Sequence, residues 1–202
     1  MVPKVVLMRR MLDLFSGLGG ASEAFVRDQG WEVVRVENEP LLEGVECTRM
    51  MDVTDVLDSD LVGTWDLIWA SPPCTEFSRA YNAPAPTAQR EGREFKPDLS
   101  LVRAAVAIIE CLEPKWWVIE NVHGAMKPLM PILGPPTLLV GPFALWGSIP
   151  PLDLPKGFKH AKSDNDTGGH DPLRSQRRAV VPLEISQALL EAVTSQTTLD
   201  QF

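Results

Sequence analysis

Short apolar runs that alternate with helical segments limit the folds open to this chain. The runs cover about 11–15, 33–36, 47–51, 66–70 and 116–119. Helical patterns lie over about 22–29 and 100–112, and a third follows Pro182. Strands that alternate with helices pair in parallel, because each crossover returns the chain to the same end of the sheet. The sequence therefore predicts an α/β fold with a doubly wound, mostly parallel sheet.

The length and composition favour one globular domain. The chain has 202 residues, of which 45% are hydrophobic, enough for a sizeable core. We expect one domain over 1–202, with a flexible loop at about 79–97 and an irregular Pro/Gly-rich segment at about 128–170. No apolar run approaches the roughly 18 residues that cross a bilayer, and a signal-peptide core is missing. We therefore expect a cytoplasmic protein that does not contact membranes.

Charge is distributed unevenly along the chain. The net charge is −8, and the segment 37–66 alone carries nine acidic residues and one arginine. By contrast, the segment 156–178 carries six Lys and Arg against three Asp. This basic stretch is far weaker than that of a typical DNA-binding protein, so composition indicates only a modest site for an anionic ligand.

One of the three cysteines has distinctive surroundings. Cys47, Cys74 and Cys111 form no C-x-x-C pair, and the three histidines fit no metal spacing, so neither a disulfide framework nor a metal site is predicted. Cys74 ends Ser71-Pro72-Pro73-Cys74, directly after an apolar run, which is typical of a strand that delivers a thiol to a pocket. As a nucleophile it needs a nearby positive charge, since a free thiol is mostly protonated at neutral pH. An inert cysteine is the alternative.

A glycine turn, DLFSGLGG over 13–20, connects the first strand to the first helix. Glycines let the backbone approach a ligand, and the helix N-terminus offers free N–H groups. Ser22 stands where a dinucleotide loop has its third glycine, so an adenosine ligand without a pyrophosphate fits better. Glu37 is suited to a ribose diol and Asp52 to an adenine amino group. The alternative is a tight structural turn beside surface acids.

Several polar residues each follow a predicted strand. These are Gly17, Glu37, Asp52, Cys74 and Glu120. Ligands of doubly wound sheets bind beyond the carboxyl ends of the strands, so we expect these residues to converge at one edge. Burial would raise the pKa of Glu120, and a protonated glutamic acid can donate a proton to a heterocycle. Capping of the next loop is the alternative for Glu120.

An arginine cluster, Arg174-Ser175-Gln176-Arg177-Arg178, precedes an apolar stretch near the C-terminus. The guanidinium group suits planar and phosphate acceptors because it presents a rigid fork of donors. Taken alone, such a cluster is more often solvated surface.

Four motifs, taken in order, resemble those of the cytosine-C5 DNA methyltransferase family. They are Asp13–Gly20, Ser71–Ser78 (SPPCTEFS), Val118–Val122 (VIENV) and the arginine cluster. The resemblance covers nearly the whole chain. It implies a Rossmann-like methyltransferase fold, S-adenosylmethionine as cofactor, and duplex DNA as partner with the target base flipped out of the helix.

The resemblance also implies residue roles. Cys74 would attack C6 of cytosine and make C5 nucleophilic, Glu120 would protonate N3, and Arg178, or alternatively Arg174, would brace the base or its phosphate. The implied cofactor-binding residues are Asp13, Phe15, Ser16, Gly17, Gly19, Glu37, Asn38, Asp52, Val53 and Pro73. The implied substrate-binding residues are Ser78, Arg79, Asn121 and Arg174.

The chain departs from the family pattern in its second half. The stretch Ala179–Pro182 resembles the family's final motif and follows the arginines directly, so a separate target-recognition domain is missing there, as in phage-like short members. Sequence recognition would then come from 128–178, from the loop at 79–97 or from a protein partner. Two alternatives stay open. The same chemistry could act on RNA or a free cytosine nucleotide, or the chain could be a non-catalytic cofactor-binding subunit.

Overall fold

One mixed sheet organises the part of the chain described by the computed structural model, which comprises residues 8–78, 82–161, 166 and 169–199. The strand order is β3-β2-β1-β4-β5-β7-β6. The strands are β1 (Arg9–Leu14), β2 (Trp31–Glu37), β3 (Thr48–Met50), β4 (Leu67–Ala70), β5 (Trp116–Val122), β6 (Leu138–Val140) and β7 (Phe143–Ser148). In this order, β3, β2, β1, β4 and β5 pair in parallel, whereas β7 pairs antiparallel with β5 and with β6. The predicted doubly wound, mostly parallel Rossmann-like fold is confirmed.

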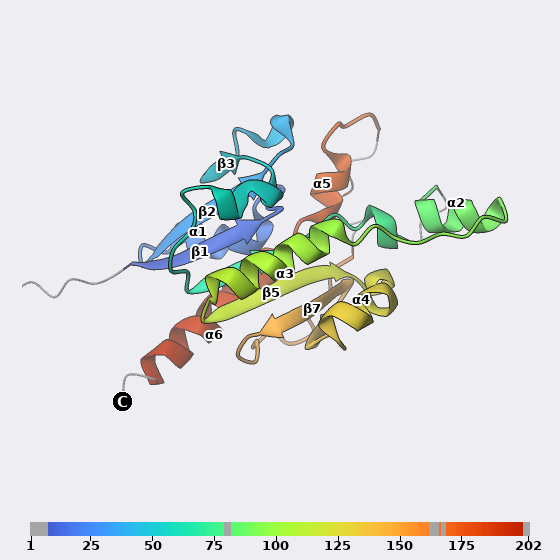
Figure 1. Cartoon of the computed structure of the whole chain (residues 1–202). Coiled ribbons are helices and arrows are strands. Elements are labelled where there is room, and N and C mark those ends of the chain that lie inside the picture. Colours follow the sequence, from blue (N-terminus) through green and yellow to red (C-terminus); the bar gives the residue numbers. More distant parts are fainter. Residues whose placement is uncertain (1–7, 79–81, 162–165, 167–168, 200–202) are drawn as a thin grey trace, which may run out of the picture.

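Helices cover both faces of this sheet (Figure 1). The helices of the described residues are α1 (Glu23–Arg27), α2 (Pro84–Arg90), α3 (Ser100–Leu112), α4 (Met126–Leu133), α5 (Arg174–Ala179) and α6 (Leu183–Leu199). Short 3-10 turns, η1 (Gly20–Ser22), η2 (Pro40–Leu42), η3 (Val53–Asp58), η4 (Thr75–Phe77) and η5 (His123–Ala125), connect them. Helices α3 and α4 pack on one face, and α1 and α6 pack on the other.

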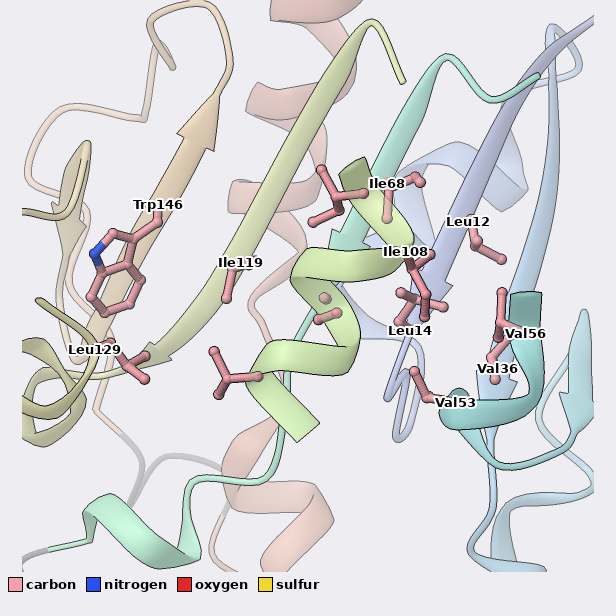
Figure 2. Close-up of a cluster of buried hydrophobic side chains, with 14 of the residues drawn as sticks. Leu12, Leu14, Val36, Val53, Val56, Ile68, Ile108, Ile119, Leu129 and Trp146 are labelled. Atoms are coloured by element: carbon pink, nitrogen blue, oxygen red, sulfur yellow. The ribbon is translucent and has the colours of Figure 1, made fainter. Parts of the chain in front are cut away.

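Alternating strand residues build the two cores. Leu12 and Leu14 of β1 pack toward α3, whereas Met11 packs toward α1 and α6, because successive side chains of a strand point to opposite faces. Figure 2 shows the first of these clusters, in which Ile108 of α3 and Ile119 of β5 lie among strand residues. Both faces of the central strands are buried, which explains why their sequences read as continuous apolar runs.

The topology fixes where a ligand is expected to bind. From β1 the chain proceeds outward to β2 and β3 and then returns to place β4 on the other side of β1. The strand order therefore reverses between β1 and β4. In open α/β sheets, ligands bind at this switch point, beyond the carboxyl ends of the strands.

The structure differs from the sequence expectation in the segment expected to be a flexible loop at 79–97. It contains helix α2, on an arm that projects from the body of the protein (Figure 1). The prolines that suggested a loop occupy the first turn of α2, and Pro84 is its first residue. Proline is tolerated there because the N–H groups of a first turn have no partner within the helix.

A second difference lies in the first half of the Pro/Gly-rich segment at 128–170, which contains most of α4 together with β6 and β7. Residues 149–161 contain no helix or strand, as expected. Gly141 and Pro142 form only the two-residue turn between these strands, and Gly141 has a φ of 53°. They mark a tight hairpin, not a long irregular stretch, since glycine adopts a positive φ without strain. The hairpin extends the sheet beyond β5.

The described ranges contain neither a membrane-spanning helix nor a metal-binding cluster. No helix in those ranges is long and apolar enough to cross a membrane. Among the same residues, no group of three or more His, Cys, Asp or Glu side chains is arranged to hold a metal ion.

Candidate active site

A cavity of about 290 Å³ opens at the carboxyl ends of the central strands, where the strand order reverses. It is lined by the glycine turn (Asp13, Phe15, Ser16, Gly17, Leu18, Gly20, Ala21), the end of β2 (Glu37, Asn38), the loop after β4 (Ser71 to Thr75), the end of β5 (Glu120) and the α5 region (Ser175, Gln176, Ala179, Val180, Val181). The expected convergence of strand ends on one edge is therefore observed for most of the predicted site.

The glycine turn has an unusual backbone. Phe15, Gly17 and Gly19 all adopt a positive φ, of 56°, 54° and 77°. Phe15 is the exceptional residue, because a side chain in this region costs on the order of 1–3 kcal/mol and persists only where the surroundings enforce it. Hydrogen bonds from Ser16 N to Val36 O and from Gly19 N to Ser16 O enforce it here. In this conformation Phe15 lines the cavity.

Glu37 connects β2 to the glycine turn. Its Oε2 accepts a hydrogen bond from Gly17 N at 2.8 Å, and its Oε1 accepts from the backbone N–H groups of Asn38 and Glu39 at 2.9 and 3.0 Å. A carboxylate has about four acceptor sites, so Glu37 keeps capacity for a further donor. Glu37, the residue predicted to bind a ribose, thus lines the cavity, and three backbone N–H groups hold its carboxylate in place.

Asp52 does not line the cavity directly. It accepts a hydrogen bond from Nδ2 of Asn38, which lines the cavity, at 3.1 Å. Its Oδ1 accepts from the backbone N and Oγ1 of Thr54, and these hydrogen bonds hold the pKa of Asp52 below its usual value. Asp52 therefore stays ionised at neutral pH and contacts the site through Asn38.

Asp13 and Ser16 carry polar atoms that the protein does not satisfy. Asp13 Oδ2 accepts a hydrogen bond from Ser22 Oγ at 2.6 Å, but Asp13 Oδ1 and Ser16 Oγ are buried and have no hydrogen-bond partner among the described residues. Burial raises the pKa of Asp13 to about 6, against the lowering effects of Ser22 and Arg35. Buried polar atoms normally find partners, so these two fit a polar ligand in the cavity.

Cys74 and Glu120 face the same cavity from neighbouring strands. Cys74 is half-buried at the start of η4, after β4, and Glu120 is 7% exposed in β5. Buried Asn121 joins the two, because its Nδ2 donates to Pro72 O at 2.9 Å. Asn121 was predicted to bind substrate, but it lies outside the cavity lining and holds the loop that carries Cys74.

The three arginines of the arginine cluster, Arg174, Arg177 and Arg178, lie outside the cavity lining. Arg174 donates two hydrogen bonds to Asp166, at 2.6 and 2.9 Å, and Asp166 raises its pKa. Arg178 Nε lies 3.6 Å from Asp166 Oδ2, and Arg177 pairs with Asp171. In this structure, α5 presents Ser175 and Gln176 to the cavity and directs these arginines toward acidic partners. The predicted role of Arg178 or Arg174 therefore stays a prediction.

Of the remaining predicted residues that the structure describes, Pro73 lines the cavity and the others lie outside its lining. Gly19 lies against Arg35, Val53 is buried in the core, and Ser78 follows η4. Arg79 is outside the described residues.

The sequence prediction assigned arginines of α5 to the site but missed that Ser175, Gln176 and Ala179 to Val181 line the cavity. A Cβ on Gly20 would lie 2.4 Å from Val181 O, so this C-terminal segment packs directly on the glycine turn. The apolar stretch after the arginines was the available signal, but sequence alone does not show its contact with a turn about 160 residues earlier.

The comparison with protein families identifies the class of protein. The model of the C-5 cytosine-specific DNA methylase family matches residues 9–129. This range is more than half of the chain and contains the glycine turn, Cys74 and Glu120, but not the arginine cluster. The chain belongs to the C-5 cytosine-specific DNA methylase family.

A curated relative gives a more particular comparison. The "Probable DNA (cytosine-5)-methyltransferase" of Frog virus 3 (isolate Goorha) is 32% identical over 124 residues, which are 58% of this chain and 56% of the relative. The match therefore spans little more than half of that viral protein's length.

Solved structures are more distant. A proposed DNA modification methyltransferase encoded within an E. coli prophage is 22% identical, with a TM-score of 0.40, over 60% of this chain and 34% of its own. The plantazolicin methyltransferase BamL is 13% identical, with a TM-score of 0.37, over 93% of this chain and 54% of its own.

Proposed function

We propose that this protein transfers a methyl group from S-adenosylmethionine to C5 of cytosine in DNA, through a covalent bond between Cys74 and C6 of the base. The observation that carries the proposal is the shared cavity of Cys74 and Glu120, which follow or end adjacent strands beside the glycine turn. Family membership supports the same chemistry. The single sheet of the described residues supports one methyltransferase domain over 1–202.

The residues of the glycine turn fit S-adenosylmethionine. The cofactor supplies, when bound, a methyl group on a positively charged sulfonium. Asp13 Oδ1 would accept a hydrogen bond from its ammonium group, and Ser16 Oγ offers a second polar contact. Glu37 would accept from the ribose hydroxyls, while Asp52 supports the site through Asn38. Phe15 and Pro73 provide apolar lining.

Cys74 and Glu120 would divide the work on the base. The Cys74 thiolate adds to C6, and the electron pair of the C5–C6 double bond becomes available at C5. Glu120 donates a proton to N3, which stabilises the electron-rich ring. After C5 has taken the methyl group, loss of the C5 proton to a base restores the double bond and expels the thiolate, and N3 returns its proton to Glu120. Covalent addition thus replaces one difficult step with two easier ones.

The substrate must reach a cavity that a stacked base cannot enter. A base in duplex DNA therefore has to be flipped out. The arm that carries α2 projects from the body of the protein (Figure 1). Arg90, Arg93 and Lys96 lie on or beside α2. We expect these groups to contact DNA near the cavity, together with the proposed contacts of Ser78, Arg79 and an arginine of α5.

A substrate panel tests this proposal. We expect labelled methyl groups to pass from S-adenosylmethionine to duplex DNA, with binding that weakens as salt rises, because a polyanion releases counterions on binding. Single strands, RNA and free cytosine nucleotides serve as comparisons. Methyl transfer to RNA or nucleotides but not to DNA would mean that DNA is not the substrate. Cofactor binding without transfer to any of them would favour a non-catalytic subunit.

A further inference from the structure

Arg35 is a buried charge that the proposed chemistry does not use. It lies in the middle of β2, paired in register with Asp13 of β1, and only 2% of it is exposed. It is outside the lining of the cavity. A buried guanidinium is costly unless its donors are satisfied, so its partners define what it does.

The guanidinium of Arg35 contacts three different segments. Nε donates to Ser22 Oγ at 2.8 Å, and Nη2 donates to Gly19 O at 2.9 Å and to Glu23 Oε2 at 3.2 Å. Nη1 donates to Glu46 O at 2.9 Å, in the loop that leads into β3. The side chain of Arg35 thus connects the glycine turn, the start of α1 and the loop before β3.

The glycine turn rests on this group. A Cβ on Gly19 would lie 2.2 Å from Arg35 Cζ, so glycine is required there by the arginine as well as by its backbone conformation. The guanidinium group of Arg35 packs directly against Gly19. Arg35 therefore supports the glycine turn where it packs on β2.

A relay of hydrogen bonds extends from Arg35 to the cavity. Ser22 Oγ accepts from Arg35 and donates to Asp13 Oδ2 at 2.6 Å, and both Ser22 and Asp13 are buried. This chain fixes one oxygen of Asp13 and leaves Oδ1 without a partner among the described residues. The orientation of the Asp13 carboxylate is thus determined by Ser22 and Arg35.

We infer that Arg35 is a positioning residue for the cofactor site, which supports the glycine turn through Gly19 and holds the ionised Asp13 carboxylate through Ser22. The inference rests on the proposed function, because it takes a cationic cofactor as the ligand of Asp13. A cation in this cavity requires a negative Asp13, and burial alone opposes that charge.

The charge of Asp13 gives this role a measurable signature. Arg35 and Glu37 of β2 face Asp13, and Cys74 and Glu120 line the same cavity. Burial raises the pKa of Asp13 to about 6, Ser22 and Arg35 lower it, and Glu37 raises it. Cofactor affinity should therefore fall as the pH drops through 6. Removal of Ser22 or Arg35 raises the pKa further and moves this midpoint upward.

Calorimetric titration of S-adenosylmethionine between pH 5 and pH 7.5 tests the inference on four variants. We expect Ser22→Ala and Arg35→Met to raise the pH midpoint by about one unit, which would weaken binding by about tenfold at pH 5 but only by about twofold at pH 7. Arg35→Lys keeps the charge but not the fork of donors, so it should weaken binding at every pH with a smaller midpoint shift. Arg49→Met, which removes a surface arginine of neighbouring β3 paired with Asp60, should match the wild type.

The outcomes separate the inference from the proposed function. Wild-type affinity and an unchanged midpoint in Ser22→Ala would overturn the inference, as would lost affinity in the Arg35 variants without any midpoint shift. The Ser22 variant removes one buried oxygen, so it decides the question even where Arg35→Met does not fold. A wild-type protein that binds no S-adenosylmethionine would instead contradict the proposed function itself.

Discussion

The Cys74→Ala variant is expected to transfer methyl groups at least about 10⁴-fold more slowly than the wild type, the scale of loss seen when an enzyme loses its nucleophile. C5 of cytosine is too electron-poor to accept a methyl group unaided, so the reaction depends on addition of the thiolate to C6. The variant should still bind S-adenosylmethionine. Cys74 is half-buried, and the hydrogen bond from Phe77 N to its carbonyl oxygen involves only backbone.

Single-turnover transfer to duplex DNA, together with calorimetry of the cofactor, measures both effects. Cys111→Ala provides a matched control, since Cys111 is exposed and lies outside the cavity lining. Wild-type turnover in Cys74→Ala would exclude the covalent route. Loss of cofactor binding in that variant would give Cys74 a structural role.

The Asp13→Asn variant is expected to be more stable than the wild type at pH 8, by up to about 3 kcal/mol in the cofactor-free state. Burial raises the pKa of Asp13 from 3.8 to about 6. With a raised pKa in the folded state, the protonated form stabilises the protein below pH 3.8, and this contribution is lost as the pH rises through 6. At pH 8 the ionised carboxylate therefore opposes folding, whereas asparagine is neutral and can still accept from Ser22.

The same substitution should weaken S-adenosylmethionine binding by at least about tenfold, because a buried charge partner is lost. Denaturant unfolding at pH 8 and pH 4.5 measures the stability gain, which should shrink at the lower pH. Asp58→Asn is the control, since the Asp58 side chain is exposed and lies outside the cavity lining. A less stable Asp13→Asn protein at pH 8 would mean that Ser22 and Arg35 stabilise the carboxylate more than burial destabilises it.

The sequence predicted the central sheet because its signal is local. Strands buried on both faces read as continuous apolar runs, and the helices between them carry a 3.6-residue period. The sequence did not predict α2, whose prolines occupy a first turn, or the β6–β7 hairpin, whose Gly141 suggested irregular chain. Proline interrupts the interior of a helix but is compatible with its first turn, and glycine weakens a strand but is compatible with the turn of a hairpin.

The site was predicted in part. The rule that ligands bind at strand ends brought Gly17, Glu37, Cys74 and Glu120 together correctly. It could not show that Asp166 pairs with Arg174 and Arg178, because residues this close in sequence but outside a regular element pair at no fixed spacing. Arg35 gave no signal either, since a lone arginine in an apolar strand does not reveal its partners.

The most direct measurement uses duplex DNA that contains 5-fluorocytosine, incubated with the protein and S-adenosylmethionine and separated on a denaturing gel. Fluorine at C5 cannot leave as a proton does, so the base should stay bonded to the enzyme through Cys74 Sγ. We predict a shifted protein–DNA band for the wild type that is missing for Cys74→Ala. A wild-type protein that binds the cofactor but forms no adduct on any duplex would contradict the proposed DNA methyltransferase mechanism.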